Sequence, residues 1–313
     1  MAEARAEPPL LVIAGSTATG KTGLSIALAR TLRADEIAAE VISADSRQVF
    51  RGLDIGTAKV PPSERADVPH HGLDLVDPDE PFSVADFVRH ARTALAGIAE
   101  RGGIAILVGG TGLYLRAVAR GLDTEALPSD PEVRARVEAA LASDGLAAAV
   151  ARLRELAPRL ASRIDLANSR RVARALEIAE IRGDAPPPPP LGYDGPVAWL
   201  GLRLEPQVHR EWIARRARQQ FDAGLIEEAR ALRERFDPGL PAFSAIGYRE
   251  AWAVLDGEID EEAAIERDAA RNLAFARRQA TWFRSERGIE WLDATSAPLE
   301  RALVVARELI AAA

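Results

Sequence analysis

The 313-residue chain contains no cysteine and four histidines, and only two of its 40 basic residues are lysine. Without cysteine it can form neither a disulfide framework nor a thiolate zinc site, and it has no cysteine nucleophile. Four histidines leave little for a histidine-based metal site. We therefore expect the chemistry of this protein to rest on other side chains.

The chain also lacks a long hydrophobic run. No uncharged apolar segment approaches the roughly 18 residues that a membrane-spanning helix needs. Its first ten residues, MAEARAEPPL, are acidic where a signal peptide would be basic and then apolar. We expect a cytoplasmic protein without a membrane segment.

The composition that is present is that of a folded globular protein. Hydrophobic residues make up 48% and charged residues 28%, which excludes a mainly disordered chain, and the length favours two domains or one domain with a large insertion. A net charge of −7 argues by itself against a nucleic-acid partner. However, arginines gather between Arg267 and Arg287 and between Arg210 and Arg218, and local patches rather than net charge set the affinity for phosphate.

Short apolar runs alternate with polar loops and helical patterns in the first third of the chain. The runs are Leu10–Ala14, Val41–Ser43 and Ile104–Val108, each followed by glycine or aspartate. Such runs are typical of parallel strands buried on both faces, so we predict an α/β fold with a P-loop NTPase-like core, in which helices flank a parallel sheet. Ligands then bind at the carboxyl ends of the strands.

The middle of the chain has a helical pattern in place of the alternating apolar runs and loops. From Pro131 to about Arg182 the pattern is helical throughout, and it closes at Gly183 and at the proline run Pro186–Pro190, which we interpret as a stiff, extended linker. Strand character resumes at Val197–Leu204, and a last strand is predicted at Ile289–Leu292. We predict a core domain made of residues 8–120 and 193–313, interrupted by an all-helical insertion domain at residues 121–192.

The first loop carries a phosphate-binding motif. It matches G-x-x-x-x-G-K-[ST] between a predicted strand and a predicted helix, and consists of Gly15, Ser16, Thr17, Ala18, Thr19, Gly20, Lys21 and Thr22. Backbone N–H groups and the helix N-terminus would face an anion, Lys21 would supply a point charge, and the Thr22 hydroxyl a ligand for Mg²⁺. The pattern does not tell a nucleoside triphosphate from another diphosphate ester.

Further segments carry a resemblance to a known family. They are Asp45-Ser46-Arg47-Gln48-Val49-Phe50, Asp54-Ile55-Gly56-Thr57-Ala58-Lys59 and Gly109-Gly110-Thr111-Gly112-Leu113-Tyr114. With the P-loop they resemble the tRNA dimethylallyltransferases, also called isopentenyl-tRNA transferases. The resemblance covers nearly the whole length and continues through Asn168–Glu177 and Arg277–Phe283. The sequence has no zinc-finger segment of the eukaryotic kind, so we expect a member of the bacterial type.

The resemblance implies transfer of a dimethylallyl group from dimethylallyl diphosphate to N6 of the adenosine just 3′ of the tRNA anticodon, with Mg²⁺ as cofactor. The P-loop would hold the departing diphosphate. Asp45 is the candidate acceptor of the amine proton, Thr111 would touch the substrate or the diphosphate, and Arg216 aligns with the family arginine that meets the diphosphate.

The resemblance also implies which residues contact tRNA. Asp45, Ser46, Arg47, Gln48 and Thr111 would meet the target base and its neighbours, and Arg134, Arg170, Arg171, Val172, Ala173 and Arg174 would meet the tRNA from the insertion. The target base must be extruded from the anticodon loop to be reached. We expect a monomer, and Lys59 has no assigned role.

Three other interpretations remain open. A small-molecule P-loop kinase would share the strand, loop and helix, although no Walker-B aspartate ends the run Ile104–Val108. A prenyltransferase acting on free AMP would share the P-loop half. A GTPase-like RNA-binding module would need an N-K-x-D motif, which the sequence lacks.

Overall fold

The computed structural model describes residues 7–65, 67–124, 126, 128–186 and 188–313. The chain divides into two compact units. The core unit comprises the chain up to Gly121 together with Gly192–Ala313, and the insertion unit is Leu122–Leu191. Each unit buries a hydrophobic core of its own.

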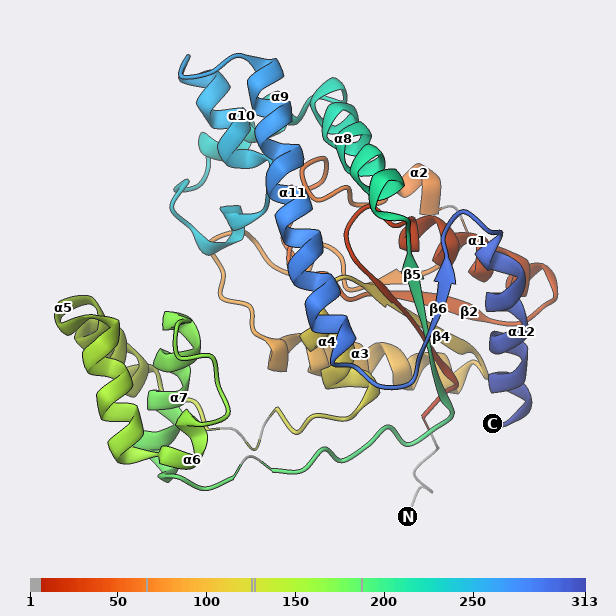
Figure 1. Cartoon of the computed structure of the whole chain (residues 1–313). Helices are drawn as coiled ribbons and strands as arrows, with labels where there is room; N and C mark the ends of the chain where they lie inside the picture. Colours follow the sequence, from red (N-terminus) through yellow and green to blue (C-terminus); the bar gives the residue numbers. More distant parts are fainter. Residues whose placement is uncertain (1–6, 66, 125, 127, 187) are drawn as a thin grey trace. The chain divides into compact units, whose positions relative to one another are not determined.

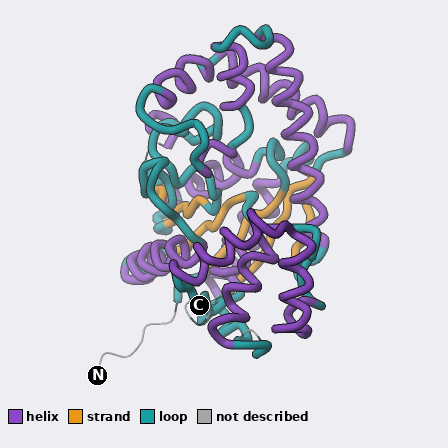
Figure 2. Tube along the Cα trace, turned by 90° about the vertical axis from the view of Figure 1, so that its left-hand side faces the viewer, coloured by secondary structure: helices purple, strands orange, loops and turns teal. Residues whose placement is uncertain are grey.

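A six-stranded sheet organises the core unit (Figure 1), and Figure 2 shows its strands gathered in a single layer. The strands are β1 (Leu10–Gly15), β2 (Ala39–Ser43), β3 (His70–His71), β4 (Ile104–Gly109), β5 (Val197–Arg203) and β6 (Ile289–Asp293). Their order is β3-β2-β4-β1-β5-β6 and all pairs are parallel. The carboxyl ends of the strands therefore meet at one edge, and β1 lies between β4 and β5 at the place where the strand order reverses.

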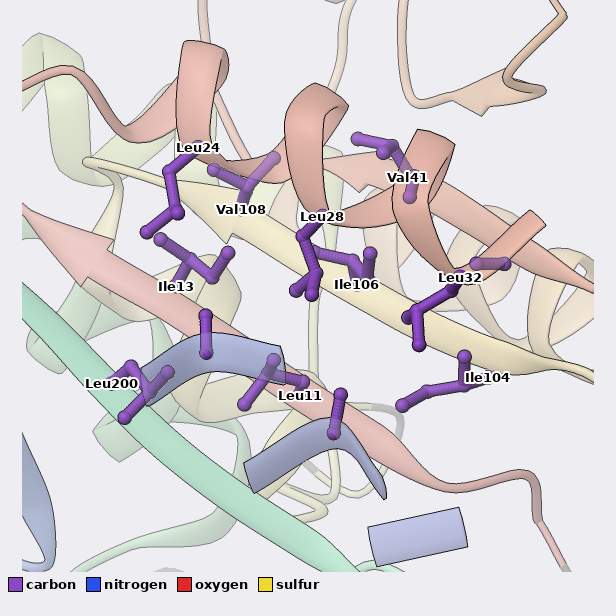
Figure 3. Close-up of a cluster of buried hydrophobic side chains, with 14 of the residues drawn as sticks. Leu11, Ile13, Leu24, Leu28, Leu32, Val41, Ile104, Ile106, Val108 and Leu200 are labelled. Atoms are coloured by element: carbon purple, nitrogen blue, oxygen red, sulfur yellow. The ribbon is translucent and has the colours of Figure 1, made fainter. Parts of the chain in front are cut away.

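One face of the sheet is covered by α1 (Lys21–Ala34) and α12 (Pro298–Ala311). Leu24, Leu28 and Leu32 recur at every fourth residue of α1, so they lie on one side of the helix. Figure 3 shows these leucines pointing toward Leu11 and Ile13 of β1 and toward β4. This packing fixes the start of α1 against the end of β1, which is where the P-loop lies.

The other strand residues are buried as well. Leu10 and Val12 alternate with Leu11 and Ile13 along β1, and all four are completely buried, so the second face of the sheet is also covered. Two helices that contact the strands, α3 (Val84–Glu100) and α4 (Gly112–Ala119), supply this cover. A capping box between Ser83 and Asp86 starts α3.

A second hydrophobic core forms among helices that follow β5. They are α8 (Pro206–Asp222), α9 (Leu225–Arg233), the 3-10 helix η1 (Pro241–Ser244), α10 (Tyr248–Leu255) and α11 (Glu261–Arg284). Phe243 and Tyr248 pack edge to face with their ring centroids 6.0 Å apart. The segment Val49–Leu53 after β2 packs into the same core. The helices thereby hold the loop that follows β2, and the short helix α2 (Pro62–Arg65) comes later in that loop.

The regular elements of the insertion unit, within the described residues, are all helices. It consists of α5 (Pro131–Leu156), α6 (Pro158–Ala161) and α7 (Ser169–Arg182), and α5 is interrupted at Gly145, whose φ is +81°. Its core contains Val137, Leu153 and Val172. Side chains of Asp130 and Asn168 accept backbone N–H groups at the starts of α5 and α7.

The structure confirms the predicted α/β class and the parallel sheet flanked by helices. The strands predicted near residues 10, 104, 197 and 289 are present, and β2 begins at Ala39, two residues earlier than predicted. The two-residue strand β3 was not predicted, because two residues carry no readable periodicity. In the proline run the described residues form neither helix nor strand, and residue 187 lies outside the described residues. No helix in the described ranges has the length and apolarity to cross a membrane.

Candidate active site

The P-loop connects the end of β1 to the start of α1. Gly15 has φ +147°, and a Cβ at this position would lie 2.7 Å from the backbone oxygen of Leu202. Gly20 has φ +82° at the residue before α1. Lys21 donates a hydrogen bond of 2.6 Å to the carbonyl of Ser16 and so closes the loop on itself. A strand before the loop, a helix after it and glycines at positive φ within it are the local structure that the phosphate-binding motif requires.

The environment of Lys21 lowers the pKa of its ammonium group. Burial lowers its pKa to about 7, the nearby Arg216 contributes to the lowering, and Asp45 opposes the shift. Burial also lowers the pKa of Arg216, while Asp45 and Asp268 oppose this. The buried Nε of Arg216 has no hydrogen-bond partner among the described residues. Two cations at close quarters, one with an unused donor, form a site that favours a multiply charged anion.

Helix α11 also contacts the P-loop through hydrogen bonds. The Gln279 side chain accepts a hydrogen bond of 2.8 Å from the backbone N–H of Thr17 and donates one of 3.0 Å to the carbonyl of Gly110. Ser16 donates from its hydroxyl to the carbonyl of Ala276 at 3.1 Å. Gln279 therefore joins the loops that follow β1 and β4.

Asp45 lies in the turn that follows β2. Its Oδ1 accepts hydrogen bonds from the backbone N–H groups of Arg47 at 2.8 Å and Gln48 at 3.4 Å. The hydroxyl oxygen of Thr111 accepts one of 3.1 Å from the backbone N–H of Ser46. Asp45 and Thr111, which come from neighbouring strands, are thus brought to the same edge of the sheet, with one oxygen of Asp45 left outside these turn contacts.

Two cavities meet at this edge. The larger has a volume of about 400 Å³ and is lined in part by Ser46, Arg47, Thr111, Arg271 and Arg278. The smaller has a volume of about 80 Å³ and is lined in part by Lys21, Thr22, Gln48 and Gly110. Residues that line both cavities are Thr17, Asp45, Thr57, Arg216 and Phe275. The site therefore has a narrow compartment at the P-loop that adjoins a wide one, with Asp45 and Arg216 at the junction.

The residues predicted to read the target base are not equally placed. Asp45, Ser46, Arg47 and Thr111 line the wide cavity. Gln48 lines the narrow one instead. Its amide oxygen accepts from the Ser43 hydroxyl at 2.9 Å, and its amide nitrogen donates to the carbonyl of Thr57 at 3.1 Å. The Arg47 guanidinium donates to the carbonyl of Pro241 at 3.0 Å.

The predicted tRNA contacts of the insertion unit fall into two groups. Arg134 and Arg174 both pair with the buried carboxylate of Glu177, at 3.2 Å and 2.6 Å. Arg170 and Arg171 are exposed at the start of α7, and neither makes an ion pair with a residue that the structure describes. Val172 is completely buried in the core of this unit, so its side chain has no surface to offer a partner, and Ala173 is half-buried.

Sequence reasoning missed several residues of the site, chiefly on α11. Arg271, Asn272, Phe275 and Arg278 line the wide cavity, and Gln279 holds the P-loop. The arginine-rich stretch after Arg267 was the available signal, but it does not say which side of the helix faces a cavity. His209 was also missed; its Nε2 lies 2.8 Å from the carbonyl oxygen of Thr17.

Comparison with protein families gives a match over most of the chain. Residues 48–286 match the model of a family described as IPP transferase. The match begins after the P-loop. Among individual proteins, the tRNA dimethylallyltransferase of Anaeromyxobacter dehalogenans (strain 2CP-C) is 45% identical over 296 residues, which are 90% of this chain and 94% of that protein.

Solved structures agree with the sequence relatives. The crystal structure of the full-length tRNA isopentenylpyrophosphate transferase from Bacillus halodurans is 39% identical and superposes with a TM-score of 0.69, covering 97% of this chain and 96% of that one. A eukaryotic dimethylallyltransferase acting on tRNA is 26% identical, with a TM-score of 0.80 over 97% of this chain and 80% of that one.

Proposed function

Because this chain belongs to the IPP transferase family, we propose that it transfers a dimethylallyl group from dimethylallyl diphosphate to N6 of the adenosine immediately 3′ of the tRNA anticodon, position 37, and releases diphosphate. The relatives that match most of the chain are named tRNA dimethylallyltransferases, and one solved relative is described as acting on tRNA. We further propose that the protein acts as a monomer.

The observation that carries the proposal is the junction of the two cavities. A phosphoryl-transfer enzyme and a prenyltransferase both need an anion cradle, but a prenyltransferase must place the carbon next to the diphosphate beside a nucleophilic base. The narrow cavity contains Lys21 and Thr22, the wide cavity contains Thr111 and has room for a base, and Asp45 borders both. This arrangement fits a diphosphate on one side of Asp45 and an extruded adenine on the other.

On the donor side, the reaction breaks the bond between C1 of the prenyl group and a diphosphate oxygen. Negative charge grows on the leaving diphosphate as this bond lengthens. Lys21 and Arg216 both line the narrow cavity where that charge would develop. Donors that are in place before the reaction stabilise the transition state without reorganising, and enzymes commonly obtain most of their rate enhancement in this way.

Mg²⁺ fits the donor set at the P-loop if the substrate supplies most of its ligands. The described residues contain no cluster of three or more histidine, aspartate or glutamate side chains that could hold a metal by themselves. Thr22 and Asp45 do line the narrow cavity, and Mg²⁺ commonly takes one or two protein oxygens together with phosphate oxygens and water. We propose that Thr22 holds the ion, which would neutralise part of the leaving-group charge.

On the acceptor side, the adenine amine is a weak nucleophile and must lose a proton as its bond to C1 forms. Asp45 is held by the backbone through Oδ1. Its second oxygen can accept that proton and pass it to water. Thr111, whose hydroxyl is fixed by the Ser46 N–H, would contact the base or the diphosphate from the neighbouring strand.

For the bound tRNA, we propose contacts from Ser46, Arg47 and Gln48 near the base and from the arginines of α7. Gln48 would have to exchange its contact with Thr57 for a contact with RNA. Arg170 and Arg171 are suited to phosphate because they are exposed. At Val172 and Ala173 we propose that the backbone, and not the side chain, contacts the tRNA. Arg134 and Arg174 would contribute from their ion pairs with Glu177.

A comparison of acceptors tests the proposal. The protein is incubated with labelled dimethylallyl diphosphate and Mg²⁺ together with unmodified tRNA, with AMP, or with a nucleoside and ATP. We expect label in tRNA alone, and none in a matched tRNA transcript whose adenosine 37 is replaced by guanosine. Label in AMP alone would indicate a nucleotide prenyltransferase, and consumption of ATP without prenyl transfer would indicate a kinase; either result would overturn the proposal.

A further inference from the structure

The segment Asp54–Ala58 joins the two sides of the active site, yet the proposed chemistry gives it no role. Its backbone is held by an unusual partner, the Glu228 carboxylate of α9. Glu228 accepts hydrogen bonds from three successive backbone N–H groups, those of Asp54 at 3.2 Å, Ile55 at 2.7 Å and Gly56 at 3.0 Å. A fourth, of 2.7 Å, comes from the Tyr248 hydroxyl. One carboxylate with four donors fixes the path of this segment strongly.

Two further side chains hold the same segment. Gln220 of α8 is buried and donates from its amide to the carbonyls of Ile55 at 2.7 Å and Gly56 at 2.9 Å. Lys59, also buried, ends the segment with salt bridges of 2.6 Å to Asp54 and Asp74. The backbone at Gly56 packs directly against Tyr248, because a Cβ at this position would lie 2.6 Å from the Tyr248 ring.

These contacts together fix the position of the Thr57 carbonyl group. The Thr57 carbonyl accepts a hydrogen bond from the Arg216 guanidinium at 3.4 Å and another from the Gln48 amide at 3.1 Å. Arg216 lies at the proposed diphosphate site. Gln48 lies in the same turn as Asp45 and donates its backbone N–H to the Asp45 carboxylate. A single backbone oxygen therefore connects the arginine of the donor side with the turn of the acceptor side.

We infer that Glu228 is a positioning residue: through the backbone of Asp54–Thr57 it sets Arg216 relative to the turn that carries Asp45 and Gln48. This inference rests on the proposed function, but the position of Arg216 affects diphosphate binding, which can be measured without catalysis. When the Glu228 carboxylate is lost, the three N–H groups lose their common acceptor and the Thr57 carbonyl is no longer fixed. Arg216 then loses the contact that orients it toward the diphosphate.

The test uses the full chain and inorganic diphosphate as the probe, with binding measured by calorimetry. Glu228→Gln keeps the size of the side chain but turns an NH₂ group toward the backbone donors. We expect it to weaken diphosphate binding about tenfold in the wild-type background and to have little effect in an Arg216→Met background. Glu227→Gln, at an exposed neighbour on α9, is the matched control and should leave diphosphate binding unchanged in both backgrounds. Tyr248→Phe removes one of the four donors and should give a smaller loss of the same kind.

The non-additivity separates positioning from general destabilisation. If Glu228→Gln weakens binding equally in the Arg216→Met background, or if it matches Glu227→Gln, the inference is wrong. If Glu228→Gln does not fold, Tyr248→Phe decides in the same way. Because no prenyl transfer enters this measurement, its outcome is distinct from that of the acceptor comparison, in which the proposed function itself succeeds or fails.

Discussion

At the scale of single residues, Asp45 combines a structural contact with a proposed chemical role. Its Oδ1 accepts the backbone N–H groups of Arg47 and Gln48, while its second oxygen is the proposed proton acceptor. Asn at this position can keep the first oxygen and cannot act as a base. We expect Asp45→Asn to reduce kcat by about 10²-fold or more, with the affinity for dimethylallyl diphosphate little changed.

Single-turnover kinetics and calorimetry on the same preparation check this prediction, and Asp45→Ala is the companion variant. The alanine variant should lose the turn contacts as well, so its kcat should be no higher than that of Asp45→Asn. Full activity in Asp45→Asn would remove this residue from the proton transfer.

Lys21 makes diphosphate binding depend on pH. Its pKa in the free protein is lowered to about 7 by burial and by Arg216, whereas a bound anion favours the protonated ammonium. Above pH 7 binding must therefore include the uptake of a proton. We expect the Kd of dimethylallyl diphosphate to rise with pH between 7 and 9, by up to about tenfold per unit. Lys21→Met should bind weakly and lack this part of the slope, and parallel pH curves for the two proteins would contradict the account.

At the scale of elements, Gln279 joins α11 to the loops after β1 and β4. Its partner Thr17 is 262 positions away in the sequence. Gln279→Met keeps the volume but leaves the Thr17 N–H and the Gly110 carbonyl without their partner. We expect the free energy of unfolding to fall by about 1–3 kcal/mol, and binding of diphosphate to weaken.

Urea unfolding and calorimetry measure both effects. Gln219→Met, on the exposed side of α8, is the control and should behave as the wild type. Unchanged diphosphate binding in Gln279→Met would mean that α11 does not shape the P-loop.

Helix α7 offers a test of the proposed RNA contacts. Arg171 is exposed at its first turn, so it can neutralise a phosphate without first breaking an ion pair. We expect Arg171→Ala to weaken tRNA binding and to flatten the plot of log Kd against log salt concentration by about 0.7 to 1 unit, the value for one released counterion. Arg163→Ala, at another exposed arginine of the insertion unit, is the control. A slope equal to that of the wild type would exclude Arg171 as a phosphate contact.

The elements also differ in how far sequence could predict them. The P-loop was predictable because its eight residues are contiguous and the motif requires a strand before it and a helix after it. Arg216 was assigned by resemblance alone, and the structure places it between the two cavities. Gln279 and Glu228 were not predicted as site residues, because their contacts arise only when distant helices pack, and nothing local in the sequence marks a side chain that holds a loop.

At the scale of the whole molecule, hydrophobic patterning was sufficient for the layer architecture. Buried parallel strands such as β1 and β4 read as uninterrupted apolar runs, and the short length of these runs and the glycine at the end of each distinguish them from buried helices. Patterning could not give the strand order, since β5 joins the sheet beside β1 only after the insertion has intervened. That order is what brings the P-loop, the Asp45 turn and α8 to one edge.

On the proposed mechanism, the P-loop of this molecule holds a leaving diphosphate and not a nucleotide whose phosphoryl group moves. The stoichiometry of a complete reaction distinguishes the two possibilities when dimethylallyl diphosphate, Mg²⁺ and unmodified tRNA are present and ATP is absent. We predict one diphosphate released for each N6-dimethylallyladenosine found after digestion of the tRNA. Diphosphate release without a modified adenosine, or modification that requires ATP to be consumed, would contradict the account.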